Sequence, residues 1–199
     1  MCNFFSAVVL RNGDVLSHPM LDSHSDLVRY FKLPDTEAYI QHFAKVELTP
    51  TDWMDVDTWV FRVDDAVAPP WWDDVAAQVE QTVRDRVRGM VISVGTRDLI
   101  VDGSWIVGGT ARVSDMRAGR IVHVGGSAQI HDVGDSAQIH DVGDSAQIHD
   151  VWGAAQIHDV WGAAQIHDVR GSAQIHRVRG SAQLDASAKD HLVNLTRVG

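Results

Sequence analysis

The sequence contains one cysteine, Cys2, and no long run of apolar residues. A single thiol cannot form a disulfide within the chain, and the lack of disulfides is typical of proteins in a reducing cytoplasm, which is the compartment we expect. The chain also has no basic and apolar leader, and it lacks the roughly 18 consecutive apolar residues that suit a membrane helix. We therefore expect neither secretion nor membrane insertion.

Positive charge is scarce as well, with 17 Lys and Arg against 27 Asp and Glu and a formal net charge of −10. The imbalance lies mainly in the first half, because residues 1–106 hold 9 basic and 17 acidic side chains, whereas residues 107–186 hold 6 and 9. A protein that binds nucleic acid through a basic surface is therefore disfavoured.

Familiar catalytic signatures are missing: the chain has no phosphate-binding loop, Cys-x-x-Cys pair or Ser-His-Asp arrangement, and we expect no cofactor. The one catalytic candidate is Cys2, which would become an N-terminal nucleophile with its own amine as base if Met1 were removed. The opening MCNFFSAVV is similar to the start of class II glutamine amidotransferases, although Asn3 stands where those enzymes usually carry glycine. The alternative is that Cys2 is a small apolar residue at the edge of a strand.

What the sequence does have is a nine-residue phrase that occurs seven times between Val124 and Ala186, in copies such as VGDSAQIHD and VWGAAQIHD. A short fixed period of this kind determines the fold class. The segment Ala-Gln-Ile-His alternates apolar and polar residues, which predicts a strand with Ala and Ile on one face. Glycine in the second and third positions of most copies indicates a corner, and the Val that opens the phrase can point inward there.

One phrase cannot close a ring around a packed interior, because five residues of strand already span roughly 17 Å. Two phrases supply two strands and two corners. The sequence therefore predicts a narrow parallel β-solenoid with two phrases, or 18 residues, in each coil. Ala, Ile and Val would fill its interior, and Gln and His would form ladders on two outer faces.

The two-phrase coil places alternate copies side by side. We expect Trp152 to lie beside Arg170, Trp161 beside Arg179, and Asp159 beside Arg177. The histidines of alternate copies should form solvated ladders without a metal, because the repeat itself dictates their spacing. The residues that we expect to contact a partner are Trp152, Trp161, Arg170, Arg179, His140, His149, His158 and His167.

The sequence predicts three parts: a small α+β domain, residues 1–103, the solenoid, residues 104–186, and a C-terminal cap, residues 187–199. An Asn-Gly pair at 12–13 predicts a hairpin, and helices are expected over residues 22–31, 35–43 and 71–88. The domain would cover one end of the solenoid, since an open end invites strand addition. The cap or a homo-oligomer contact would cover the other end. Tryptophans 53, 59, 71 and 72 could line a pocket or pack in the core.

A polar run in the first domain, HPMLDSHSD, contains residue types that bind metal ions. We name His18, Asp22 and His24 as the candidate ligands. The alternative is a helix N-terminus with solvated histidines, which is the more common setting for such a run, and on that interpretation no metal is bound.

Four segments resemble a set of uncharacterised proteins from bacteriophages and bacterial mobile elements. They are the opening MCNF, the DSHSDL of residues 22–27, the PWWDD of residues 70–74, and the VWGAAQIHD phrase. The resemblance covers nearly the whole chain and implies that the two parts occur together. It implies no activity and no catalytic residues.

Three functions remain open. A rigid solenoid suits a non-enzymatic interaction or scaffold module with a protein partner, such as a phage-encoded factor that acts on a host protein. A second possibility is a Cys2 hydrolase or amidotransferase-like domain that the solenoid oligomerises. A third is a nucleic-acid mimic, which the near-neutral charge of the repeats disfavours.

Overall fold

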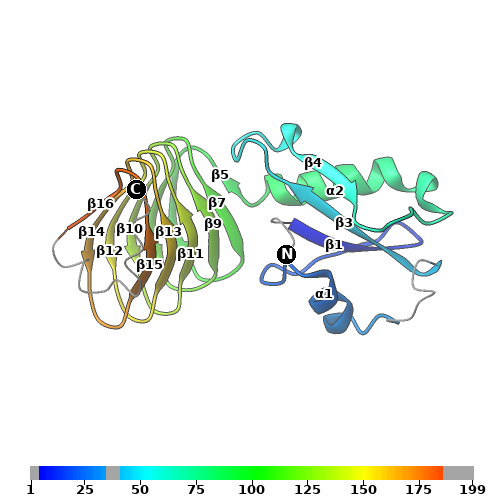
Figure 1. Ribbon diagram of the computed structural model, residues 1–199, viewed down its shortest axis with the longest axis horizontal. Helices are drawn as coiled ribbons and strands as arrows, with labels where there is room; N and C mark the ends of the chain where they lie inside the picture. Colours follow the sequence, from blue (N-terminus) through cyan, green and yellow to red (C-terminus); the bar gives the residue numbers. More distant parts are fainter. Residues whose placement is uncertain (1–4, 35–40, 186–199) are drawn as a thin grey trace. The chain divides into compact units, whose positions relative to one another are not determined.

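The computed structural model describes residues 5–34 and 41–185. The chain divides into two compact units, residues 1–89 and residues 90–199 (Figure 1). The first unit is an antiparallel sheet with two helices, and the second is a parallel β-solenoid. The fold class predicted from the sequence is therefore confirmed.

The sheet of the first unit has the order β2-β1-β3-β4, with all neighbours antiparallel. Strands β1 (Phe5–Leu10) and β2 (Val15–Leu16) form the predicted hairpin, in which Gly13 adopts a φ of +86°. A positive φ strains residues with a Cβ atom, so glycine suits this turn. Strands β3 (Phe43–Thr49) and β4 (Val60–Val63) complete the sheet.

Helix α1 (His24–Tyr30) packs Leu27 and Val28 against Val8 and Phe43 of the sheet. The helix predicted over residues 71–88 is split into a 3₁₀ turn, η3 (Trp72–Asp74), and helix α2 (Ala76–Arg88). The cause is Val75, whose φ of −122° is not helical. A second 3₁₀ turn, η2 (Val56–Thr58), precedes β4. The helix predicted over residues 35–43 falls largely outside the described residues, and its last residue opens β3.

The solenoid begins earlier in the chain than the boundary expected near Gly103. Strands β5 (Val91–Ile92) and β6 (Thr96–Ile100) pair in parallel with β7 (Ser104–Val107) and β8 (Arg112–Met116). Neither β5 nor β6 carries the Ala-Gln-Ile-His pattern, so periodicity could not mark them as part of the repeat. The predicted C-terminal cap lies outside the described residues.

Two six-stranded parallel sheets form the solenoid, in the orders β16-β14-β12-β10-β8-β6 and β15-β13-β11-β9-β7-β5. Consecutive strands of the chain alternate between the sheets, and Gln129 pairs with Gln147, which sets the coil at 18 residues. The predicted two-phrase coil is thus confirmed. The remaining strands are β9 (Arg120–Val124), β10 (Gln129–Val133), β11 (Gln138–Val142), β12 (Gln147–Val151), β13 (Gln156–Val160), β14 (Gln165–Val169), β15 (Gln174–Val178) and β16 (Gln183–Leu184).

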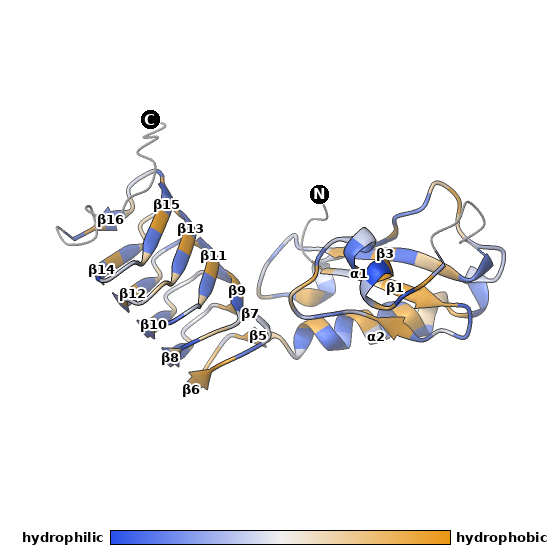
Figure 2. Cartoon of the chain, turned by 90° about the horizontal axis from the view of Figure 1, so that it is seen from below, coloured by the Kyte–Doolittle hydropathy of each residue, from blue (hydrophilic) through white to orange (hydrophobic). Residues whose placement is uncertain are grey.

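The interior of the solenoid is a thin apolar core that every repeat supplies in the same way. In β11, Ile139 and Val142 are fully buried, whereas Gln138 and His140 are exposed. Figure 2 shows the resulting bands of hydrophilic and hydrophobic residues along the strands. Strict alternation would bury Asp141 and expose Val142. Instead Asp141 is half-buried and Val142 lies in the core, as predicted for the first position of the phrase.

The corners depend on a left-handed residue in the third position of each phrase. Gly126 has a φ of +62°, and the aspartates in the same position of the next two copies have a φ of 51° and 53°. Aspartate tolerates this conformation better than most residues with a side chain. At Gly126 an added Cβ would also lie only 2.9 Å from backbone atoms of Gly109. Successive corners therefore stack backbone on backbone.

Candidate functional site

A polar row crosses the sheet of the first unit. Ser6 of β1 lies opposite Glu47 of β3, which lies opposite Arg62 of β4, and directly opposite residues share a face of the sheet. Ser6 and Glu47 are 2% and 3% exposed. Nε of Arg62 donates to Oε2 of Glu47 at 3.0 Å, and its Nη2 donates to the same oxygen. A buried carboxylate is thus held in a fixed orientation by a guanidinium.

His24 joins this row from the first turn of α1, where it is 6% exposed. Its Nε2 lies 3.0 Å from the carbonyl oxygen of Val46, and its Nδ1 lies 3.3 Å from Oδ2 of Asp64. Asp64 directly follows β4, and its backbone N–H donates to the carbonyl of Lys45. Ligand atoms of His24, Glu47 and Asp64 all lie within 4.8 Å of one another. We call His24, Glu47, Arg62 and Asp64 the sheet site.

The candidate ligands predicted from the sequence separate in the structure. His18 accepts the backbone N–H of Met20 at Nδ1, and its ring lies 4.7 Å from that of Tyr30. Asp22 accepts from Ser6 through its backbone carbonyl. Only His24 enters the sheet site, and it is buried rather than solvated. Sequence analysis missed Glu47 and Asp64, although a glutamate within an apolar strand was a usable signal.

The tryptophans of the first unit pack in its core. Trp59, Trp71 and Trp72 are all less than 9% exposed, and the ring of Trp53 lies edge-on to that of Trp59 at 5.7 Å. The pocket alternative is therefore not supported for these three buried indoles. Cys2, the catalytic candidate, lies outside the described residues and stays a prediction.

On the solenoid, outward histidines of alternate copies form two stacked columns. We name them column 1, on β10, β12 and β14, and column 2, on β11, β13 and β15. Ring centroids lie 5.5 and 5.1 Å apart in column 1 and 5.4 and 4.9 Å apart in column 2. The predicted ladders are thus present. Column 1 comprises His131, His149 and His167, and column 2 comprises His140, His158 and His176.

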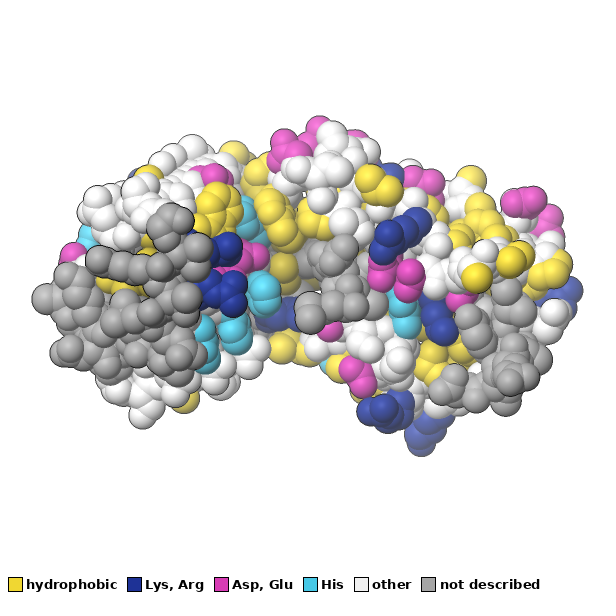
Figure 3. Space-filling model, in the orientation of Figure 1, with side chains coloured by type: hydrophobic (Ala, Val, Ile, Leu, Met, Phe, Trp, Pro, Cys, Tyr) yellow, Lys and Arg dark blue, Asp and Glu magenta, His cyan; other side chains and the backbone are white. Residues whose placement is uncertain are grey.

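Charged side chains flank both columns. Asp132, Asp150 and Asp168 pair in register beside column 1, and Oδ2 of Asp132 lies 3.0 Å from Nδ1 of His131. Beside column 2, Asp159 meets Arg177 at 3.4 Å, as predicted, and Arg179 at 3.5 Å. Figure 3 shows histidine, arginine and acidic side chains gathered on the face of β9, β11, β13 and β15.

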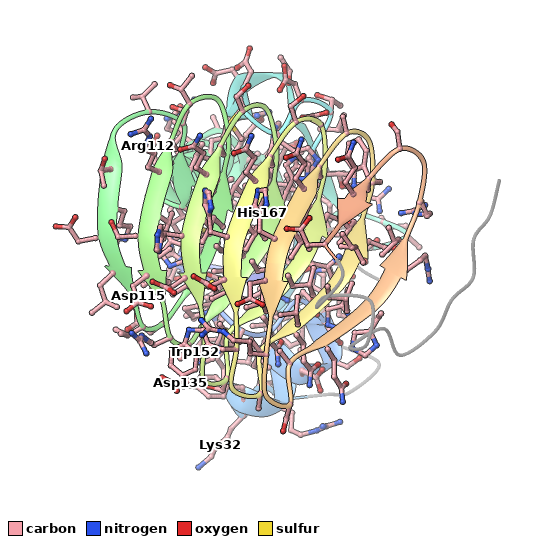
Figure 4. The ribbon with its side chains drawn as sticks, turned by 90° about the vertical axis from the view of Figure 1, so that its left-hand side faces the viewer. Lys32, Arg112, Asp115, Asp135, Trp152 and His167 are labelled. Atoms are coloured by element: carbon pink, nitrogen blue, oxygen red, sulfur yellow. The ribbon has the colours of Figure 1, made fainter. Side chains whose placement is uncertain are left out.

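The two tryptophans of the repeated phrases, Trp152 and Trp161, stack toward the preceding coil rather than the following one. Trp152 is in register with Arg170, whose N–H donates to the carbonyl before Trp152, but the expected indole–guanidinium contact is not made. The guanidinium of Arg117 lies 4.6 Å from the Trp152 ring instead. Arg170 turns to Asp150 and Asp168, at 3.0 and 3.2 Å, because carboxylates attract it more strongly. Figure 4 places Trp152 with Asp135 at one corner of the coil.

Trp161 repeats the arrangement on the other side of the coil. Its ring lies 6.2 Å from that of His123, and its register partner Arg179 pairs with Asp159. Both expected Trp–Arg contacts are therefore corrected: the register is right, but each arginine is drawn to a carboxylate.

The histidines differ in their pKa values because their surroundings differ. Burial lowers the pKa of His158 below its usual 6.5, and the neighbouring His176 and His140 lower it further against the opposing effect of Asp159 and Asp141. A hydrogen bond to Asp132 raises the pKa of His131, which is exposed. Burial also lowers the pKa of His123. Equivalent histidines in different copies of the phrase are thus chemically distinct.

Comparison with known proteins identifies no relative. No family model, no curated protein and no solved structure matches this chain. No helix among residues 5–34 and 41–185 is long and apolar enough to cross a membrane.

Proposed function

We propose that this protein is a non-enzymatic interaction module, in which the solenoid is a scaffold that presents repeated side chains to a protein partner. The observation that supports this is the pair of histidine columns, whose rings are 4.9–5.5 Å apart over a closed apolar interior. Repeated groups in register offer repeated contacts at fixed spacing, and repeat arrays commonly use such surfaces for binding.

Column 2 is the stronger candidate for the binding face. It lies beside Asp159, Arg177 and Arg179, so it combines imidazoles with charges of both signs. Arg177 is 54% exposed and Arg179 is 42% exposed, which leaves both guanidinium groups accessible to a partner. A surface that carries charges of both signs is complementary to a partner whose surface also alternates in charge. Such electrostatic complementarity contributes to specificity more than to affinity.

The setting of this interaction is also part of the proposal. The resemblance to proteins of bacteriophages and mobile elements supports a phage-encoded factor that acts on a host protein in the cytoplasm. A second copy of the chain, bound through the C-terminal end of the solenoid, is a further expected partner.

The test compares two triple variants of the full chain. One replaces column 2 (H140Q/H158Q/H176Q), and the other replaces column 1 (H131Q/H149Q/H167Q). Glutamine keeps each position polar and outward. Proteins that the wild-type chain retains from a bacterial host lysate are identified and purified. Each is then titrated against the wild type and both variants. We expect the column 2 variant to bind the purified partner at least about tenfold more weakly, a loss of about 1.4 kcal/mol, and the column 1 variant to bind like the wild type. Equal binding by all three proteins would contradict the proposed face.

A further inference from the structure

We propose that His24, Glu47 and Asp64 bind a divalent transition-metal ion. The three side chains come from α1, β3 and the residue after β4. Their ligand atoms lie within 4.8 Å of one another, and two of the three side chains are buried. This site is in the first unit and does not depend on the binding function of the solenoid.

The first argument is the proton on His24. A carbonyl oxygen only accepts hydrogen bonds, so the 3.0 Å contact with Val46 requires that Nε2 carries the hydrogen. In the neutral imidazole, Nδ1 then has a lone pair, and it faces Oδ2 of Asp64 at 3.3 Å. Two lone pairs at this distance repel each other. A cation between them removes the conflict, and it is either a second proton on His24 or a metal ion.

The second argument is that the geometry matches metal ligation. Metal-binding histidines usually donate their other ring N–H to a backbone carbonyl or a carboxylate, which fixes the tautomer, and the Nε2–Val46 bond does this here. The 3.3 Å between Nδ1 and Oδ2 is close to the edge of a tetrahedron whose arms are about 2.1 Å, which is roughly 3.4 Å.

The third argument concerns the hydrogen bonds that hold the ligands and the route by which an ion would reach them. Arg62 holds Glu47 by a bond of 3.0 Å from Nε, and carboxylate ligands are usually oriented by such outer hydrogen bonds. The side chain of Asp64 is 41% exposed, whereas that of Glu47 is 4% exposed. An ion could therefore reach the buried ligands from the side of Asp64.

The ligand set limits the class of ion. One imidazole nitrogen and two carboxylates suit Zn²⁺, Mn²⁺, Fe²⁺ or Co²⁺, whereas Ca²⁺ and Mg²⁺ prefer oxygen alone. A second group on the solenoid, His131 with Asp132 and Asp150, also brings ligand atoms within 4.8 Å. It is more exposed, so its ligands are less constrained, and it serves as the matched control.

The experiment titrates Zn²⁺ into metal-free full-length protein without a histidine tag, by calorimetry. D64N is the test variant, because its side chain is half-exposed and keeps its size, and H131A is the control. We expect one Zn²⁺ per chain to remain bound to H131A with unchanged affinity and to bind D64N at least about 10- to 100-fold more weakly. Zn²⁺ should also raise the Tm of the wild type but not of D64N.

A second measurement does not depend on any variant. In ¹⁵N-histidine-labelled wild-type protein, one equivalent of Zn²⁺ should shift the unprotonated Nδ1 resonance of His24 and leave its Nε2 protonated. The proposal is overturned if His24 carries protons on both nitrogens and is unaffected by Zn²⁺. It is also overturned if D64N binds Zn²⁺ like the wild type, or if H131A abolishes all binding.

Discussion

Trp152 lies over Gly134, the residue in the same corner position one coil earlier. A Cβ atom at Gly134 would lie only 2.3 Å from atoms of the Trp152 indole. The absence of a side chain at Gly134 therefore lets the indole rest on the backbone. The indole can then reach Arg117, which lies one coil before Gly134. Gly143 and Trp161 repeat the relationship, with the same 2.3 Å clash. In these two corners a glycine in one coil is matched to a tryptophan in the next coil, two repeats later.

The first prediction follows from this match. G134A should destabilise the protein by about 1–3 kcal/mol, the usual effect of overpacking, because the new methyl group displaces the Trp152 ring. Gly134 has no positive φ, so the alanine itself is not strained. In a W152A background the same G134A change should be nearly neutral. Urea unfolding of the four proteins measures the coupling, and equal effects in both backgrounds would contradict the contact.

The register of the solenoid was predictable, whereas the direction of these side chains was not. A nine-residue phrase with one strand leaves only the number of phrases in each coil to be decided, and two was predicted because it is the smallest number that closes a coil. Both arginines pair with carboxylates, Arg117 with Asp115 at 2.6 Å and Arg170 with two aspartates, but it is Arg117 that also lies over the Trp152 ring. Register alone does not reveal that Arg170 turns to Asp150 and Asp168.

The sheet site was largely hidden from sequence analysis for a different reason. His24 and Asp22 are close in sequence, but the pairing of β3 with β4 brings Glu47 near Asp64, and the packing of α1 on the sheet brings His24 to both. Periodicity describes local structure and repeats, and it carries no information on pairings between distant strands without a repeat. Apart from His24 itself, the local sign of this site was Glu47, a charged residue within an apolar strand.

A second prediction tests the inward and outward positions of one strand with neighbouring residues. I139A should cost about 2–5 kcal/mol, because it leaves a cavity in a fully buried position. H140A should change the free energy of unfolding by no more than about 0.5 kcal/mol, because His140 faces solvent. Thermal and urea unfolding would reveal both effects. If H140A is the more damaging change, the assigned faces of β11 are reversed.

A third prediction concerns Asp159, which lies between two guanidinium groups, those of Arg177 and Arg179. The Asp159 side chain is 14% exposed, so solvent screens it less than most surface charges. D159N should destabilise the protein by about 1 kcal/mol at low salt, and the effect should shrink in 1 M salt, where the Debye length is about 3 Å. D141N is the control, since Asp141 is one coil earlier and pairs with His140. The same loss in D141N would exclude a role for the arginines.

The last prediction uses the opposite pKa shifts of His158 and His131. The pKa of His158 is lowered from 6.5 by burial and by two neighbouring histidines, so the folded state disfavours its proton. Stability from neutral His158 is present above pH 6.5 and is lost as the pH falls through the lowered pKa. The pKa of His131 is raised by Asp132, so its contribution is present below pH 6.5 and is lost as the pH rises through the raised pKa. NMR titration should therefore show His131 losing its proton at a higher pH than His158.

Two variants separate the causes of the His158 shift. H176Q removes a neighbour in column 2 that repels the charged form, so the pKa of His158 should move back toward 6.5. H149Q removes a histidine from column 1, on the other sheet, and should leave His158 unchanged. If H149Q shifts His158 as much as H176Q does, the two columns are not electrostatically separate, and stacking within one column is not what distinguishes these histidines.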